Sequence, residues 1–166
     1  MIGRIASLHR SGGGVPKLSV TEVAVTPEGM AGDKQRDRRF HGGPERALSL
    51  YSAELIDALH AEGHPIVPGA IGENVTIHGL DWREVQPGAR LQLGELEIEV
   101  TAFAAPCTTI QDAFLGQEFT RVSHKLHPGW SRVYARVLNA GVLRVGDDAR
   151  IVDPAVLHPS LSSIRT

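Results

Sequence analysis

The stretch Arg90-Leu-Gln-Leu-Gly-Glu-Leu-Glu-Ile-Glu-Val100 decides the fold class. Apolar and polar residues alternate on both sides of Gly94-Glu95, which is the period of a strand with one buried face. A two-residue link that contains glycine is typical of a tight β-hairpin. We therefore predict two strands, over 90–93 and 96–103, that expose one face to water.

Short apolar runs separated by turn residues recur along the rest of the chain, which has 18 glycines and 10 prolines among its 166 residues. Further strands are predicted over 2–8, 20–25, 47–51, 74–77, 132–138 and 149–152. Helical patterns are fewer: one helix over 53–61, capped by Ser52 and ended by Gly63, and a less regular helical region over about 110–126. The pattern predicts a mainly β domain decorated with a few short helices.

The length of the chain fits one domain, which we place at 1–153, followed by a C-terminal tail at 154–166. A single cysteine cannot form an internal disulfide, and the first residues resemble a strand rather than a leader peptide, so we expect a cytoplasmic protein. No apolar run approaches the length of a membrane span. A net charge of −2 argues against a nucleic-acid partner, because such proteins are usually strongly basic.

Positive charge is concentrated in two segments of this otherwise acidic chain. Residues 32–46 contain five Lys or Arg against three Asp or Glu, and residues 118–136 contain four against one. A focused positive potential suits a compact anion, such as a phosphorylated cofactor, better than a long polyanion. We predict that the two segments flank one pocket.

The only cysteine, Cys107, is the first candidate for chemistry. Pro106 favours an extended conformation at Ala105, and a helix that begins near Thr108 or Thr109 would favour the thiolate form of Cys107. Cys107 is then a reactive or metal-ligating residue; the alternative is a small buried apolar residue. A cysteine hydrolase would also need a base, for which His41, His124 and His127 are the candidates.

The segment from Thr26 to Arg46 has no clear period, and we interpret it as a folded binding loop. Its cations offer hydrogen bonds to phosphate or carboxylate, and Gly42-Gly43 would let backbone amides approach an anion; the alternative is an exposed charged turn. Ser11-Gly-Gly-Gly14 is interpreted as a flexible loop. The Asn74 amide could bond the edge of a heterocycle, or could serve a turn by bonding its own backbone.

Taken in order, several motifs resemble the MOSC domain, the family named for the C-terminal domain of molybdenum cofactor sulfurases. The motifs are Gly32-Asp33-Lys34-Gln35-x-Asp37, His41-Gly42-Gly43-Pro44-x-Arg46-Ala47, Gly72-Glu73-Asn74, Pro106-Cys107 and the segment 141–146. The resemblance covers roughly residues 1–153. Thr108-Thr109 depart from it, because many relatives have a charged or aromatic residue close to the cysteine.

The resemblance implies a barrel-like β domain that handles the molybdenum cofactor, a pyranopterin with a phosphate and a metal-binding dithiolene. It implies that Cys107 is the catalytic residue, as the molybdenum ligand or as a sulfur-carrying residue. The residues that it places around the cofactor are Lys34, Arg36, Arg38, His41, Gly42, Gly43, Arg46 and Asn74.

Three functions are compatible with this assignment. The first is reduction of a small N-hydroxylated substrate at a Cys107-ligated molybdenum, with electrons from a separate donor protein. The second is a sulfur carrier in which Cys107 receives a persulfide from a pyridoxal-phosphate-dependent cysteine desulfurase. The third is a non-catalytic cofactor-binding module.

Overall fold

The computed structural model of the protein describes residues 1–34 and 43–156. The hairpin predicted around Gly94-Glu95 consists of β7 (Arg90–Leu93) and β8 (Leu96–Phe103), with Leu93 paired to Leu96. Leu91, Leu93, Leu96, Ile98 and Val100 are buried, whereas the residues between them are partly or fully exposed. The alternating pattern therefore predicted both the bounds of these strands and their buried face.

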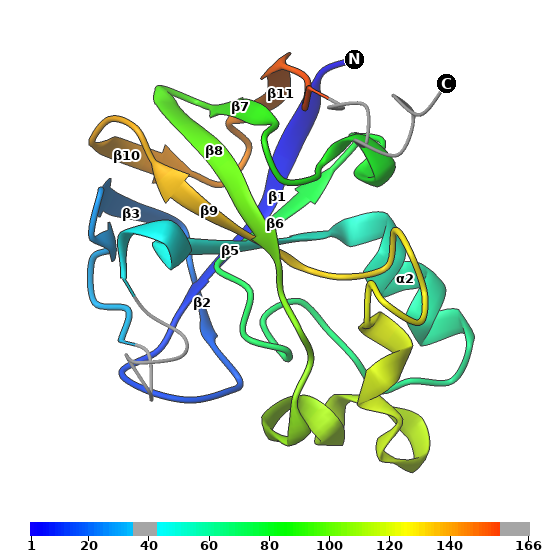
Figure 1. Cartoon of the computed structure of the whole chain (residues 1–166). Helices are drawn as coiled ribbons and strands as arrows, with labels where there is room; N and C mark the ends of the chain where they lie inside the picture. The colour runs from blue at the N-terminus through cyan, green and yellow to red at the C-terminus, as the bar shows by residue number, and fades with distance from the viewer. Residues whose placement is uncertain (35–42, 157–166) are drawn as a thin grey trace, which may run out of the picture.

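Seven strands form a closed barrel (Figure 1). Around the barrel the order is β11 (Asp148–Asp153), β7, β8, β9 (Val133–Val137), β5 (Leu48–Ser52), β6 (Val75–His78) and β1 (Gly3–Arg10). Pairing of β11 with β1 as well as with β7 closes the ring. Neighbouring strands are antiparallel except β5 and β6, which are parallel. The mainly β, barrel-like fold is confirmed.

The strand predicted over 20–25 is confirmed over 22–25, but it is not one strand with Val20, because the chain divides there between two sheets. β2 (Leu18–Val20) pairs with β1, whereas β3 (Glu22–Thr26) joins a three-stranded sheet with β4 (Gly29–Met30) and β10 (Gly141–Arg144). Val20 packs at the edge of the barrel, and Val23 and Val25 are buried under the small sheet. β4 and β10 were not predicted; β4 lies inside the segment that has no clear period.

The one α-helix among the described residues is α2 (Ala53–Ala61). The Ser52 Oγ accepts a hydrogen bond from the backbone N–H of Leu55 at 3.2 Å, a cap worth about 1 kcal/mol. Ile56 and Leu59 are buried against the barrel. The helix provides the crossover that parallel strands β5 and β6 require, and it confirms the predicted helix.

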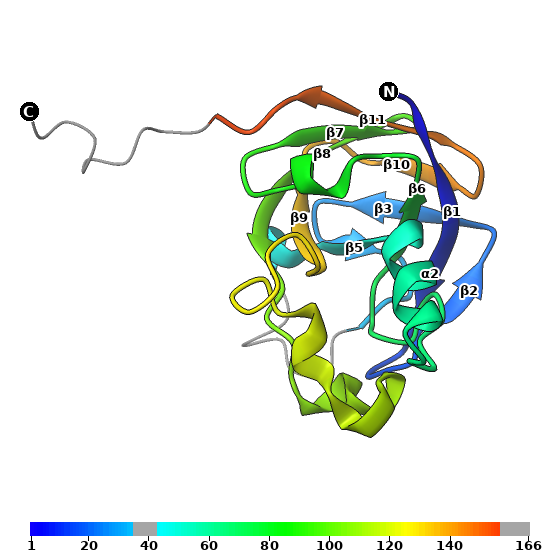
Figure 2. The same ribbon diagram turned by 90° about the vertical axis from the view of Figure 1, so that its right-hand side faces the viewer.

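The less regular helical region consists of three short 3-10 helices: η3 (Thr108–Ala113), η4 (Leu115–Gln117) and η5 (Phe119–Val122). Two further 3-10 turns are η1 (Pro44–Arg46) and η2 (Trp82–Glu84). Figures 1 and 2 show η3 to η5 at the same end of the barrel as the loop between β1 and β2. The candidate site lies at this end.

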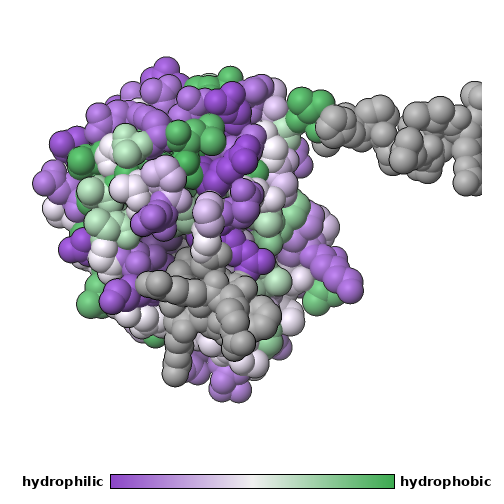
Figure 3. Space-filling model, turned by 60° about the vertical axis from the view of Figure 1, so that its left-hand side comes forward, coloured by the Kyte–Doolittle hydropathy of each residue, from purple (hydrophilic) through white to green (hydrophobic). Residues whose placement is uncertain are grey.

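The face shown in Figure 3 is mainly hydrophilic, with hydrophobic residues scattered over it. Scattered apolar residues are normal on the surface of a monomeric domain. Within the part of the chain that the structure describes, no helix has the length and hydrophobicity that crossing a bilayer requires.

Candidate functional site

A pocket of about 460 Å³ opens where the β1–β2 loop meets the start of η3. Its wall combines a thiol, three cationic side chains and a glycine pair with aliphatic groups. The thiol is that of Cys107, the cations are Lys17, Lys34 and Arg132, and the glycine pair is Gly13 and Gly14; hydroxyl groups of Ser49, Thr109 and Tyr134 also line the pocket. Sulfur and positive charge therefore meet in one cavity, although their positions in the sequence are far apart.

Cys107 lies where the chain leaves the barrel after β8. Its backbone is extended, with φ −138° and ψ 174°, and it caps η3, the 3-10 helix that begins at Thr108 as the sequence predicted. The thiol is half-buried, and its Sγ lies 2.7 Å from the Thr109 Oγ1. The alternative of a fully buried apolar cysteine is therefore not what the structure shows.

Arg132 precedes β9, and its backbone carbonyl accepts a hydrogen bond from the N–H of Ala104 at 2.9 Å. This bond ties Arg132 to the segment that leads into Cys107. The residue is only 8% exposed, and its Nε has no hydrogen-bond partner among the described residues. The sequence placed Arg132 only within a basic segment, so its burial in the pocket wall was not foreseen.

The rest of that basic segment does not line the pocket. Arg121 forms an ion pair with Glu62 and stacks over Trp130, with the guanidinium carbon 3.9 Å from the ring centre. Arg136 is paired with Glu99. Of the two predicted basic segments, the second therefore contributes only Arg132.

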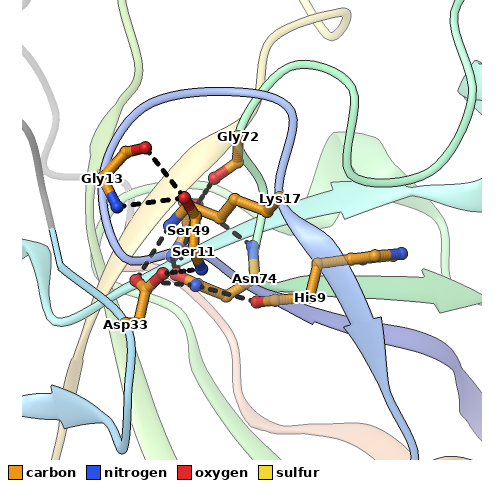
Figure 4. Close-up of polar contacts among 8 residues, drawn as sticks. All are labelled: His9, Ser11, Gly13, Lys17, Asp33, Ser49, Gly72 and Asn74. Atoms are coloured by element: carbon orange, nitrogen blue, oxygen red, sulfur yellow. Dashed lines mark hydrogen bonds and ion pairs between the residues drawn. The ribbon is translucent and has the colours of Figure 1, made fainter.

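Asp33 organises the loop that forms the other wall (Figure 4). Its Oδ1 accepts from the N–H of Ser11 at 3.0 Å, and its Oδ2 accepts from the Lys17 Nζ at 2.8 Å and from the Asn74 Nδ2 at 3.0 Å. The Lys17 and Asp33 side chains are only 8% and 4% exposed. Lys17 therefore lines the pocket with its charge already balanced, a role that the sequence did not indicate.

Asn74 lies beneath the pocket and is fully buried. Besides its bond to Asp33, its Nδ2 donates to the His9 carbonyl at 3.2 Å, and its Oδ1 accepts from the N–H of Ser49 at 3.0 Å. Ser49 in turn lines the pocket. In this arrangement the Asn74 amide positions Asp33 and Ser49, and the prediction that it bonds a heterocycle directly has no support here.

Glu73 is a second buried polar residue of this segment; the sequence placed it in the Gly72-Glu73-Asn74 motif but assigned it no chemical role. Its Oε1 accepts from the N–H of Gly69, and its Oε2 has no partner among the described residues. Burial raises the pKa of Glu73 to about 7, with the positive charge of Arg132 and the Gly69 N–H opposing that rise. An acidic group that can hold a proton near neutral pH therefore lies beside Arg132.

The remaining predicted site residues fall into two groups. Lys34 lines the pocket; Gly43 precedes η1 with φ 94°; and the Arg46 guanidinium carbon lies 5.0 Å from the ring centre of Tyr134, another lining residue. The positions that lie outside the described residues are Arg36, Arg38, His41 and Gly42.

None of the histidines in the described part of the chain lines the pocket. His124 stacks on Phe103 with ring centres 3.6 Å apart, and it lies in a turn after η5. His127 is exposed in the same turn. These two candidates for the base of a cysteine hydrolase are therefore not part of the Cys107 site.

Comparison with protein families gives a match to the model of the MOSC domain over residues 37–150, which is more than half of the chain. The chain belongs to the MOSC domain family. The match includes Cys107 and Arg132 and most of the barrel, so the observed fold and the sequence motifs agree with it.

Two bacterial proteins are similar to this MOSC chain in sequence. The uncharacterized protein YflK of Bacillus subtilis is 30% identical over 131 residues, which are 78% of this chain and 58% of YflK. Protein YiiM of Escherichia coli is 33% identical over 98 residues, which are 56% of this chain and 44% of YiiM. The matched regions thus span less than two thirds of either relative.

A solved structure supports the fold. The crystal structure of YiiM from Geobacillus stearothermophilus superposes with a TM-score of 0.67 at 25% identity, covering 91% of this chain and 75% of that one.

Proposed function

We propose that this MOSC protein binds the molybdenum cofactor in the Cys107 pocket and reduces small N-hydroxylated compounds there. The observation that carries the proposal is the convergence of one half-buried thiol with cationic side chains and a glycine pair in a single cavity. A thiolate is a soft ligand suited to a transition metal, and cations with backbone amides suit a phosphate.

The chain has one cysteine and can therefore offer the metal one thiolate ligand. This suits a metal that is already bound by the dithiolene of the cofactor. Lys34, Arg132 and the backbone of Gly13 and Gly14 are the groups in the wall that could hold the phosphate. Ile71 and Ile110 supply apolar surface for a flat ring system. The residues present therefore fit the cofactor in charge, in ligand type and in the apolar surface that they offer to its ring system.

When bound, the cofactor supplies two-electron chemistry at the metal. Reduction of an N-hydroxyl group to an amine consumes two electrons and two protons and releases water. The role of the chain is to fix the metal through the Cys107 Sγ, to orient that sulfur through the Thr109 hydroxyl, and to position the substrate. One cysteine cannot hold an iron–sulfur cluster, so we assign the electrons to a separate donor protein.

The first experiment is metal analysis of the wild type and of Cys107→Ser, both produced in a host that makes molybdenum cofactor. We expect near-stoichiometric molybdenum in the wild type and its loss from the variant. With a chemical reductant, the wild type should reduce an N-hydroxylated base, and the variant that has lost molybdenum should not. An absence of molybdenum from both proteins would contradict the proposal.

A half-buried thiol at the wall of a pocket also suits a sulfur carrier. In that case the Cys107 thiolate attacks the terminal sulfur of a desulfurase persulfide, takes that sulfur, and releases the desulfurase thiolate. Incubation with a cysteine desulfurase and cysteine would then add about 32 Da to the wild type, as one extra sulfur requires. The absence of this species in wild type, with Cys107→Ser as the blank, would count against the carrier.

A further inference from the structure

Arg132 is a buried guanidinium without a matching acceptor. It is more than nine-tenths buried and lines the pocket, yet no hydrogen bond or ion pair joins its side chain to any residue in the described ranges. A buried cation is costly unless it is paired and hydrogen-bonded. The Nε is enclosed and unpaired, and the terminal amino groups of this pocket-lining residue have no partner among the described residues, which points to a partner that enters from the pocket.

The surroundings leave this charge incompletely balanced. Lys17 and Asp33 neutralise each other, so Asp33 is not available to Arg132. Glu73 is a buried carboxyl that feels the charge of Arg132. Its Oε1 already accepts a hydrogen bond from the Gly69 N–H, and its Oε2 makes no hydrogen bond to Arg132. Its raised pKa leaves Glu73 partly protonated near neutral pH, which further reduces the compensating negative charge.

The backbone also holds Arg132 in place for ligand binding. The Ala104–Arg132 hydrogen bond continues the β8–β9 ladder, in which Phe103 pairs with Val133. Gly72 lies beside the guanidinium: a methyl group there would be 3.9 Å from the Arg132 Nη1 and 3.0 Å from Val15. Without a side chain, Gly72 leaves the approach to Arg132 open.

We infer that Arg132 forms an oxyanion subsite in the floor of the pocket, which binds a carboxylate or phosphate group through the guanidinium fork. Arginine donates two parallel hydrogen bonds to such groups, a geometry that lysine cannot reproduce. The inference rests on the proposed function only in taking this pocket as the ligand site. The oxyanion has two sources that share this chemistry: the phosphate of the cofactor and an acidic group of the substrate.

The test is a titration of the cofactor-free protein with inorganic phosphate and with acetate, followed by NMR. The Arg132 Nε–H is enclosed and unpaired, so its ¹⁵N–¹H signal reports a change at the adjoining terminal amino groups when an anion binds them. We expect a saturable shift of that signal, and binding at least tenfold weaker in Arg132→Gln, as loss of a charged hydrogen-bonding partner implies. Arg136→Gln is the matched control, since Arg136 lies on the adjoining strand and is paired with Glu99.

Arg132→Lys is a second variant in case Arg132→Gln does not fold, because lysine keeps the positive charge and removes only the guanidinium fork. We expect it to bind both anions more weakly than the wild type and more tightly than Arg132→Gln. Equal binding by wild type, Arg132→Lys and Arg132→Gln would overturn the subsite, as would a loss confined to Lys34→Gln.

The source of the oxyanion follows from repeating the titration on protein loaded with molybdenum cofactor. If loaded protein no longer binds added acetate and Arg132→Gln loses molybdenum, the cofactor phosphate occupies the subsite. If loaded protein still binds acetate and Arg132→Gln retains molybdenum, the subsite belongs to the substrate. The protein could also bind the anions through Arg132 and never take up molybdenum. That result would support the subsite and contradict the proposed function.

Discussion

Glu73 shows how a single buried carboxyl can make stability depend on pH. Its pKa is raised from 4.5 to about 7 in the folded protein, chiefly by burial. Between these values the folded state holds a proton that the unfolded state has released, so the free energy of unfolding falls as pH rises through this window. A shift of this size corresponds to about 3 kcal/mol.

We expect Glu73→Gln to remove that pH dependence. The amide keeps the acceptor for the Gly69 N–H and carries no charge at any pH, so the variant gains stability relative to wild type as pH rises from 5 to 8. The gain should approach about 3 kcal/mol at the upper end. Urea unfolding at a series of pH values measures it, and wild-type and variant curves that run parallel would contradict the assignment.

The Thr109 hydroxyl beside the Cys107 sulfur gives a second prediction. Thr109→Val preserves the shape of the side chain and removes the group that lies 2.7 Å from the Sγ. Because a hydroxyl donor stabilises the reactive thiolate, we expect alkylation of Cys107 by iodoacetamide to slow by about tenfold. Thr108→Val is the control, and similar rates for all three proteins would show that the contact has no influence.

The candidate site could be predicted from the sequence only where a residue type is rare or clustered. Cys107 is the sole cysteine, and Lys34 belongs to a run of cations, so both attracted attention. Arg132 belonged to the second basic segment, but nothing distinguished it there from Arg121, Lys125 and Arg136, because its burial depends on the pairing of β8 with β9. Lys17 gave no signal either, and Asn74 was predicted as a cofactor contact rather than as a positioning residue, because both roles arise from the Asp33 carboxylate, which folding brings to them.

At the scale of elements, the accuracy of prediction followed the strength of the local pattern. β7 and β8 alternate over many residues and join through a tight turn, which fixes their register. The segment 20–25 is equally apolar, but its division between β2 and β3 depends on partners elsewhere in the chain. β4 has two residues, too few to show a period of two.

Gly69 links the β1–β2 hairpin to the segment that contains Glu73 and Asn74. Its carbonyl accepts from the N–H of Lys17 at 3.0 Å, and its own N–H donates to Glu73. Its φ of +86° suits glycine, and a Cβ would lie 2.6 Å from the Lys17 carbonyl oxygen and 2.8 Å from the His9 ring. The two walls of the pocket can approach this closely only because the position has no side chain.

Gly69→Ala should therefore destabilise the protein by roughly 2 to 5 kcal/mol, the sum of left-handed strain and overpacking. Gly14→Ala is the matched control: its φ is +77°, but a Cβ there meets nothing within 4 Å. The control should lose only about 1 to 2 kcal/mol. Equal losses in thermal unfolding would mean that backbone strain alone matters at Gly69.

At the scale of the whole molecule, the barrel unites residues from the two halves of the chain around one site. β1 and β11 come from opposite ends of the described chain and pair through Gly3–Ala149 and Arg4–Asp148. The loop after β1 supplies one wall of the pocket, whereas Cys107 and Arg132 come from the second half. Closure of the barrel is thus what assembles the site, and no isolated segment contains it.

The position of β11 leads to a last prediction, about the C-terminal boundary. β11 pairs with both β1 and β7, and Ala149 is fully buried between them. A chain that ends at Gly146 therefore opens the barrel and leaves one edge of β1 and one edge of β7 without a partner strand. Open strand edges cost hydrogen bonds and expose apolar surface, and we expect this chain to be unfolded or aggregated. A chain that ends at Val156 keeps β11 and the partly buried Ala155 beside Gly88. Because the barrel and the pocket wall stay intact, its melting temperature and its molybdenum content should match those of the full chain. A clear decrease in the melting temperature or in the molybdenum content would mean that the domain extends beyond residue 156.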